Sequence, residues 1–343
     1  MTRAEVKAFK AATRAAGRYW GGSRISTVLV LVVVCVFAGF ALIGLFGNLL
    51  SATFMLSTTG DAFAFTGIAP PLVFLAFFGA VIFLVARALT SMGSWERWLR
   101  LSRFADANGL VFSATDADPS YPGAIFGLGS QREVTDHLRS TSDRFLDIGN
   151  YTYVTGSGKS RTTHRWGFMA IALDRSMPNM VLDSKANNGL FGGTNLPTYF
   201  SKDQVLSLEG DFDKHFTLYC PKQYERDALY VFTPDLMALL IDEVAPFDVE
   251  IVDRWMFVYS SGSFPVANPA TYQRLFRIID TVGSKTLSQT ERYADDRVGD
   301  FAANIVAPQG RRLRRGWSVG AVIAIVLFAA LWLLPNVLDI VRP

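Results

Sequence analysis

A Gly-Lys-Ser loop is the first feature of this sequence that could do chemistry. Gly156-Ser157-Gly158-Lys159-Ser160 ends like a phosphate-binding loop, but that motif needs a glycine five residues before Gly158, where Tyr153 stands. A phosphate-binding loop also joins a strand to a helix, whereas residues 145–154 and 165–173 on either side are rich in aromatic and β-branched types. We therefore interpret this loop as the turn of a hairpin.

Histidines, acids and cysteines are the other candidates. His137, His164 and His215 lie far apart, with no HxH or HExxH spacing and no cysteine pair, so we expect structural or surface histidines and no metal site. We read Cys35, in the middle of an apolar segment, and Cys220, a small buried residue on a strand, as reduced.

Two acidic clusters are the remaining candidates for a cation site. Glu209, Asp211 and Asp213 lie where a turn is expected to lead into a strand, and a second cluster is expected on the solvent face of the last helix. The second cluster comprises Asp295, Asp296 and Asp300. We expect solvated carboxylates at both places. The sequence predicts no catalytic residue and no cofactor, and an enzyme is the less favoured reading.

Long apolar segments indicate how the chain is placed in a membrane. Half of the 343 residues are hydrophobic and 18% are charged, below the roughly 25% usual for soluble domains. Three segments are long enough for a hydrocarbon core of about 30 Å: residues 25–45, 71–89 and 317–338. The first is too long for the apolar core of a signal peptide and lacks an Ala-x-Ala cleavage pattern. We expect three transmembrane helices.

The basic residues flank these spans on one side. Residues 1–24 contain six cations, and four arginines precede span three, whereas residues 46–70 contain no Lys or Arg. Arg87 lies at the end of span two, and Arg97, Arg100 and Arg103 follow it. The positive-inside rule then predicts a cytoplasmic N-terminus, an external hairpin loop, a cytoplasmic domain and an external C-terminus of a plasma-membrane protein. Residues 46–70 are apolar for a loop and are compatible with an interfacial or a re-entrant helix.

The cations of residues 1–24 lie along one face of a predicted amphipathic helix. We expect contact with anionic lipids of the inner leaflet, worth about 1 kcal/mol for each cation, although a plain basic tail remains an alternative. The predicted membrane-surface residues are Arg3, Lys7, Lys10, Arg14, Arg18, Arg311, Arg312, Arg314 and Arg315.

Residues 92–310 are predicted to form an α+β domain inserted between spans two and three, with residues 311–343 supplying the basic flank and the third span. Within it, residues 101–300 carry 19 Lys and Arg against 26 Asp and Glu. Such an acidic domain argues against nucleic acid as a partner, because the basic charge belongs to the bilayer edges.

The predicted elements alternate between helix and strand. Helices are expected at 95–108, 132–139, 224–230, 234–244 (with Thr233 as N-cap and Pro234 first) and 269–303, where Gly283 is the expected break. Strands are expected at 110–114, 145–154, 165–173, 180–182, 205–208, 216–220, 249–252 and 255–259. Helices at both ends would then join the domain directly to spans two and three.

Residues 208–240 resemble part of a family of uncharacterised bacterial membrane proteins that carry a cytoplasmic domain of unknown function. The matching positions are Leu208, Glu209, Gly210, Phe212, Phe216, Tyr219, Thr233 and Pro234. The resemblance implies a membrane-tethered cytoplasmic domain and brings no functional residue with it. We therefore expect a membrane-anchored scaffold, adaptor or sensor with an unidentified protein partner. The alternatives are a membrane-surface enzyme acting on a lipid or envelope precursor, and an accessory subunit of another membrane protein.

Overall fold

The structure is a computed structural model with two compact units, Met1–Arg100 and Leu101–Pro343. It describes residues 1–18, 20, 24–59, 76–83, 95–141, 145–188, 193–300, 302–316, 325–326 and 328–329. Helix α4 (Trp95–Ala107) contains the division between the units, and Gly109 follows it with a positive φ of 67°, as the sequence predicts for a helix ended by glycine.

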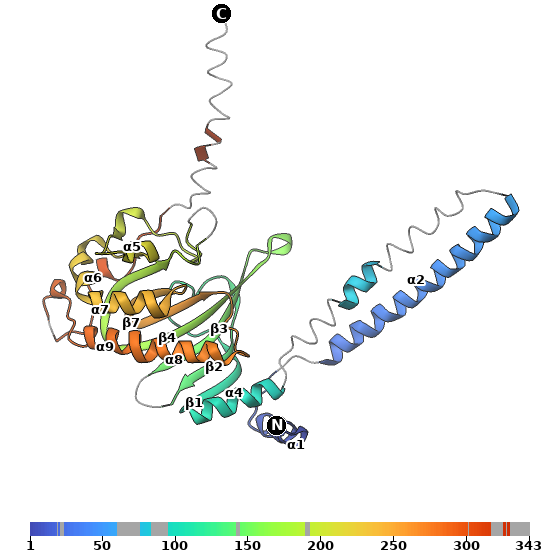
Figure 1. The fold of residues 1–343 in the computed structure, drawn as a ribbon, viewed down its shortest axis with the longest axis horizontal. Coiled ribbons are helices and arrows are strands. Elements are labelled where there is room, and N and C mark those ends of the chain that lie inside the picture. Colours follow the sequence, from blue (N-terminus) through green and yellow to red (C-terminus); the bar gives the residue numbers. More distant parts are fainter. Residues whose placement is uncertain are drawn as a thin grey trace, which may run out of the picture. The chain divides into compact units, whose positions relative to one another are not determined.

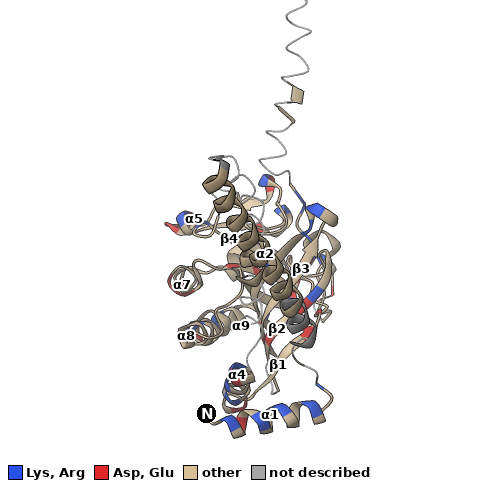
Figure 2. Ribbon diagram, turned by 90° about the vertical axis from the view of Figure 1, so that its right-hand side faces the viewer, with Lys and Arg blue, Asp and Glu red and all other residues tan. Residues whose placement is uncertain are grey.

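The first unit contains two further named helices, α1 (Arg3–Ala15) and α2 (Arg24–Thr59) (Figure 1). Helix α1 begins with a capping box, in which Thr2 Oγ1 accepts from the Glu5 amide and the Glu5 carboxylate accepts from the Thr2 amide. Cationic side chains follow α1, whereas α2 beyond Arg24 has no charged residue (Figure 2).

One helix of the described chain, within α2, is long and apolar enough to cross a membrane. This segment is Val32–Thr58, near the N-terminus. Helix α2 has 36 residues, about 54 Å at 1.5 Å per residue, so the chain stays helical 14 residues past the predicted end of span one at Leu45. The helix therefore extends into residues 46–70 as far as Thr59, within the segment for which the sequence left a helix open, and residues 60–70 lie outside the described residues.

The other two predicted spans fall largely outside the described residues. Residues 76–83 of span two are helical, and the Phe78 ring lies 6.3 Å from the Phe37 ring of α2. Within span three, residues 325–326 and 328–329 are described, and they are helical.

A seven-stranded antiparallel sheet is the centre of the second unit (Figure 1). Its order is β1-β2-β3-β4-β6-β5, and β7 pairs with the other edge of β4. The strands are β1 (Leu110–Ala117), β2 (Ser130–Ser140), β3 (Leu146–Thr155), β4 (Thr162–Ser184), β5 (Val205–Leu206), β6 (Phe216–Tyr219) and β7 (Asp248–Ser261). The predicted α+β class is confirmed for this unit.

The helix predicted at 132–139 is wrong, because these residues form strand β2. Two irregularities in its pairing with β3 and a positive φ of 50° at Asp136 break the alternation of a strand. Val134 and Leu138 are both fully buried, and because their β3 partners Tyr151 and Ile148 are three residues apart, the bulge turns the two side chains to opposite faces of the sheet.

Bulges also explain why four segments that were predicted as separate strands form only two strands, β4 and β7. Residues 165–173 and 180–182 belong to the 23-residue strand β4, whose pairing with β7 shifts between Ala172 and Met180. Pro178 lies at this bulge, where a strand tolerates proline. Residues 249–252 and 255–259 belong to β7, which bends at Asp253 with a positive φ of 52°.

Helices cover one face of the sheet, where α7 lies beside the continuous run of α8 and α9 (Figure 1). They are α5 (Phe212–His215), α6 (Glu225–Val231), α7 (Pro234–Leu239), α8 (Pro269–Ile278) and α9 (Ser284–Thr290). Short π-helical segments, Leu240–Val244 and Ile279–Gly283, continue α7 and join α8 to α9. Thr233 occupies the predicted N-cap position of α7, but its side chain makes no cap hydrogen bond.

The last predicted helix ends at Thr290 instead of reaching residue 303. Residues 302–316 form instead an extended segment, which we call the C-terminal strap. Its main chain is fixed to the domain: Ser201 N donates to Arg314 O at 3.0 Å, and Gly316 N donates to Tyr199 O at 2.7 Å. The expected helical connection to span three is thus wrong, because a hydrogen-bonded strap takes its place.

The opposite face of the sheet holds an aromatic core under irregular segments. Phe126 of the loop after β1 contacts Tyr151, Phe168 and Phe257 at ring-centre distances of 4.9 to 5.6 Å. Leu313 of the strap joins the same buried cluster. This face is therefore closed largely by irregular chain, which includes the short 3₁₀ turn Pro308–Gly310.

Glu250 of β7 is a buried carboxylate that holds these irregular segments to the sheet. It accepts from Ala124 N at 2.6 Å, from Asn179 Nδ2 at 2.9 Å and from the Tyr259 hydroxyl at 2.9 Å. Asn179 Oδ1 in turn accepts from Leu313 N of the strap at 3.1 Å. Burial raises the pKa of Glu250, and the three donors act against that rise.

Replacement of Glu250 by alanine is expected to lower the free energy of unfolding by about 3–5 kcal/mol, because three buried donors lose their acceptor. Chemical denaturation of detergent-solubilised protein measures the effect. Glu209→Ala, at an exposed acid, is the matched control and should change stability by less than about 0.5 kcal/mol. Equal stability of the two variants would contradict the anchoring role of Glu250.

Candidate functional site

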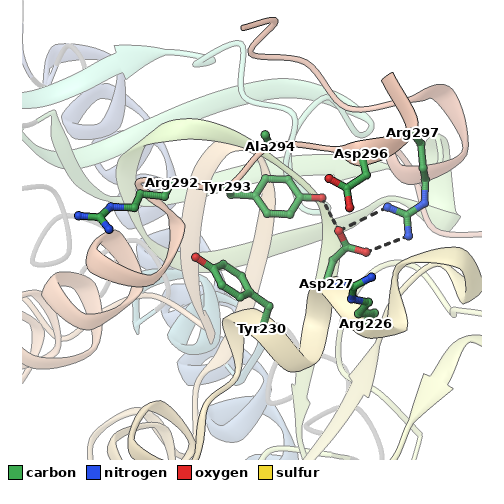
Figure 3. Close-up of a pocket in the computed structure, with 8 residues that line it drawn as sticks. All are labelled: Arg226, Asp227, Tyr230, Arg292, Tyr293, Ala294, Asp296 and Arg297. Carbon is green, nitrogen blue, oxygen red and sulfur yellow. Dashed lines mark hydrogen bonds and ion pairs between the residues drawn. The ribbon is translucent and has the colours of Figure 1, made fainter. Parts of the chain in front are cut away.

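A pocket of about 500 Å³ lies between α6 and the chain that follows α9. We call it the α6 pocket (Figure 3). Its lining residues are Arg226, Asp227, Tyr230, Arg292, Tyr293, Ala294, Asp296 and Arg297.

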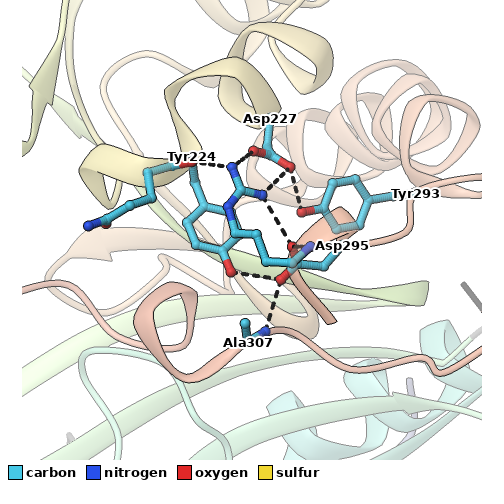
Figure 4. Close-up of polar contacts among 7 residues, drawn as sticks. Tyr224, Asp227, Tyr293, Asp295 and Ala307 are labelled. Atoms are coloured by element: carbon cyan, nitrogen blue, oxygen red, sulfur yellow. Dashed lines mark hydrogen bonds and ion pairs between the residues drawn. The ribbon is translucent and has the colours of Figure 1, made fainter. Parts of the chain in front are cut away.

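The wall of the pocket is built on the guanidinium group of Arg297. This residue lies in a short 3₁₀ turn, Asp296–Val298, and its side chain reaches α6. Arg297 Nη2 pairs with Asp227 Oδ2 at 2.9 Å and Nη1 pairs with Asp295 Oδ1 at 3.2 Å, while the guanidinium lies 4.0 Å from the centre of the Tyr224 ring (Figure 4). The charge of Arg297 is therefore neutralised within the protein.

Two tyrosines and a main-chain amide complete the network (Figure 4). Tyr293 donates to Asp227 Oδ1 at 2.8 Å, and Tyr224 donates to Asp295 Oδ2 at 2.7 Å. Ala307 N donates to the same Asp295 oxygen at 2.9 Å. Both carboxylates are thus engaged by internal donors, and neither is placed as a base.

Electrostatics favour the ionised forms of this network. Burial would raise the pKa of Asp295, but its hydrogen bonds from Ala307, Tyr224 and Arg297 outweigh burial and lower that pKa. Burial would likewise lower the pKa of Arg297, and Asp227 and Asp295 raise it instead. Burial and the neighbouring Asp227 raise the pKa of Tyr293. The framework is a fixed arrangement of paired charges.

Exposed side chains that could contact a ligand surround this network of paired charges. Arg226 is exposed and makes no ion pair in the part of the chain that the structure describes, and Tyr230 is 48% exposed. Arg292 is exposed and lies 3.5 Å from Glu291. The pocket therefore offers a cation and an aromatic surface to an anionic group, and it holds no nucleophile beside a base.

A second polar cluster surrounds His137, which the sequence did not single out. Its Nδ1 lies 2.5 Å from Asp116 Oδ2, its Nε2 contacts Asp147, and Asp147 accepts from the Tyr121 hydroxyl at 2.5 Å. His137 is 2% exposed and Asp147 is fully buried. Burial would lower the pKa of His137, but the two carboxylates raise it, so we interpret the cluster as an internal ion pair.

The predicted membrane-surface residues fall in two groups. Arg3, Lys7, Arg14 and Arg18 are exposed around α1, and Lys10 lies with its ammonium 5.5 Å from the centre of the Trp95 ring. Arg311, Arg312, Arg314 and Arg315 belong to the strap, are exposed, and Arg314 pairs with Asp203. The structure contains no bilayer, so contact with lipid stays a prediction.

Other sequence candidates have structural places. Residues 156–160 join β3 to β4, which confirms the hairpin turn. Cys220 is buried, as expected, and burial raises its pKa to about 12. The placement of Asp295 on a solvent-facing helix is wrong, because this residue is 3% exposed and lies after α9. No group of three or more His, Cys, Asp or Glu in the described ranges could hold a metal ion.

No protein-family model matches the chain, and no curated protein matches it. Among solved structures, the crystal structure of the mycobacterial trehalose monomycolate transport factor A, TtfA, is similar at a TM-score of 0.39 and 10% sequence identity. That match covers 55% of this chain and 93% of TtfA. A likeness at this level supports no assignment of function, so the family resemblance of residues 208–240 stays an expectation.

The His137 cluster predicts a pH dependence of stability. Because the pKa of His137 is raised above its unfolded value of about 6.5, its contribution is complete below pH 6.5 and is lost as pH rises through the folded pKa. His137→Gln is expected to lower the free energy of unfolding by about 3–5 kcal/mol at pH 6 and to remove this loss above pH 6.5. Denaturation at several pH values measures both effects.

His164→Gln is the matched control, because His164 contacts the Thr155 hydroxyl rather than a carboxylate. It should keep the pH profile of the wild type. A profile above pH 6.5 that is identical in His137→Gln and wild type would contradict the ion-pair interpretation.

Proposed function

We propose that this chain is a membrane-anchored binding protein, a scaffold, adaptor or sensor, whose α6 pocket receives an acidic segment of a protein partner. The observation that carries this proposal is the division of charge in the pocket. Its acid Asp227 is held by Arg297 and by the Tyr293 hydroxyl, and the lining carries three arginines against two aspartates, with Arg226 lacking a described partner. Such a surface can attract an anionic group without having the means to transform it.

Aromatic contacts between the chain before the predicted membrane hairpin and the chain after it support the proposed membrane anchor. Trp20 precedes α2 and Trp95 and Trp98 open α4, and the Trp20 ring lies 6.3 and 5.9 Å from theirs. Phe9 of α1 joins this cluster at 6.1 Å from Trp20 and 6.2 Å from Trp95. The chain that leaves through α2 therefore returns to its starting point, as a membrane hairpin requires, and tryptophan is favoured at the bilayer interface.

The proposed topology follows from the positions of the cations. The N-terminus and the domain lie in the cytoplasm, the domain is inserted between spans two and three, and the C-terminus lies outside. The exposed cations of α1 face anionic lipids of the inner leaflet in this arrangement. The protein is accordingly a multi-pass protein of the plasma membrane.

A photo-crosslinking amino acid at position 230, on the pocket wall, tests the binding function in native membranes. We expect a discrete crosslinked partner, because Tyr230 is exposed beside the cationic group of Arg226. Arg226→Glu should reduce the yield at least roughly fivefold, which corresponds to about 1 kcal/mol for a surface charge contact.

Arg165→Glu, at an exposed arginine of β4 outside the pocket, is the control and should leave the yield unchanged. The proposal would be wrong if no partner were crosslinked at position 230, or if Arg226→Glu and Arg165→Glu gave equal yields.

A further inference from the structure

A second pocket, of about 470 Å³, lies where the C-terminal strap crosses the bulge between β4 and β7. We call it the strap pocket. Arg311 and Arg312 of the strap line it, together with an apolar group formed by Met177, Val252, Ile305 and Val306. It is distinct from the α6 pocket, and none of these six residues lines both.

Paired bulges create this hollow. The register of β4 against β7 shifts around Met177, and Asp253 opposite it has a positive φ of 52°, so the two strands bend apart from regular pairing. Asn304 of the strap fills one side: its Oδ1 accepts from Ser176 N at 2.6 Å, and its Nδ2 donates to Asp174 O at 3.1 Å. The pocket is therefore built from fixed main chain.

The strap holds its two arginines in different ways. Arg311 Nε donates to Val306 O at 2.8 Å, which fixes the side chain over the strap itself. Arg312 is exposed and makes no hydrogen bond or ion pair within the described ranges, although its neighbour Leu313 is buried and hydrogen-bonded to Asn179. Burial raises the pKa of the nearby Glu250, and the charge of Arg312 offsets part of that rise. Arg312 is thus an available cation on a rigid support.

One acid, Asp253, also lines the pocket, and its Oδ1 accepts from the Ser176 hydroxyl at 3.0 Å. Two arginines against one aspartate leave the lining with net positive charge in a domain that is acidic as a whole. Guanidinium groups are the side chains best suited to phosphate oxygens. The polar side of the pocket therefore fits a phosphate group.

The apolar side and the position of the pocket indicate where such a phosphate comes from. Ile305 is 50% exposed, so an apolar surface reaches solvent beside the arginines. Arg312 is five residues from position 317, where the predicted third span begins, and five residues of extended chain cover at most about 18 Å. A phosphate next to apolar chain at that distance from the hydrocarbon is the chemistry of a lipid headgroup.

We propose that the strap pocket binds the phosphate of an anionic membrane lipid, with Arg312 and Arg311 on the phosphate and Ile305 against the glycerol and acyl carbons. This inference rests on the proposed membrane anchor, and it does not depend on the α6 pocket. It gives Arg311 and Arg312, which the sequence predicts only as membrane-surface residues, a defined phosphate site.

Thermal stability of the full chain in neutral detergent, titrated with short-chain phosphatidylglycerol, tests the proposal. We expect saturable stabilisation, with a dissociation constant at least tenfold weaker in Arg312→Gln. Short-chain phosphatidylcholine and inorganic phosphate are the comparison ligands, and both should stabilise less, because the first lacks net negative charge and the second lacks apolar carbons. Ile305→Ser should weaken the binding of phosphatidylglycerol and leave the binding of inorganic phosphate unaffected.

Arg165→Gln is the matched control and should bind phosphatidylglycerol within twofold of wild type. Equal affinity in Arg312→Gln and wild type would overturn the proposal, and so would inorganic phosphate binding as tightly as the lipid. Carbonate extraction distinguishes failure of the proposed membrane anchor from failure of the lipid site. Release of the chain from membranes refutes the anchor. Retention of the chain with unchanged lipid affinity in Arg312→Gln refutes the lipid site alone.

Discussion

The buried carboxylate of Glu250 is the contact on which the second unit depends most. The sheet alone leaves one aromatic face uncovered, and the chain that closes it has little secondary structure to satisfy its own amides. The Glu250 carboxylate accepts a hydrogen bond from the Ala124 amide and one from Asn179 Nδ2, and Asn179 Oδ1 accepts from the Leu313 amide. One acid therefore fixes both the loop after β1 and the strap that leads toward the predicted third span.

This arrangement links folding to placement at the membrane. A flexible linker would let the domain turn relative to the chain that leaves it, whereas the strap is hydrogen-bonded as far as Gly316. The strap pocket arises from the same contacts, because the bulge that receives Asn304 also opens the hollow beneath Arg312. A pocket that is fixed in this way can bind the proposed lipid phosphate without rearrangement of the core.

Sequence reasoning predicted the α+β class and most of the strands, because local patterns carry that information. It failed at β2, where the bulge at Asp136 interrupts the alternation of the strand and buries Val134 and Leu138 on opposite faces of the sheet. It also missed the His137 and Arg297 networks. Asp116, His137 and Asp147 come from three strands, and Asp227 and Arg297 are 70 residues apart, so only the pairing of the strands and helices brings them together.

Cysteine accessibility in intact cells tests whether the domain is cytoplasmic and held between membrane spans. Cys35 and Cys220 are replaced by serine, and single cysteines are placed by Thr2→Cys, Asp61→Cys, Lys159→Cys and Val341→Cys. We expect a membrane-impermeant maleimide to label positions 61 and 341 in intact cells, and positions 2 and 159 only after permeabilisation. Labelling of position 159 in intact cells, or of positions 159 and 341 from the same side, would contradict this topology.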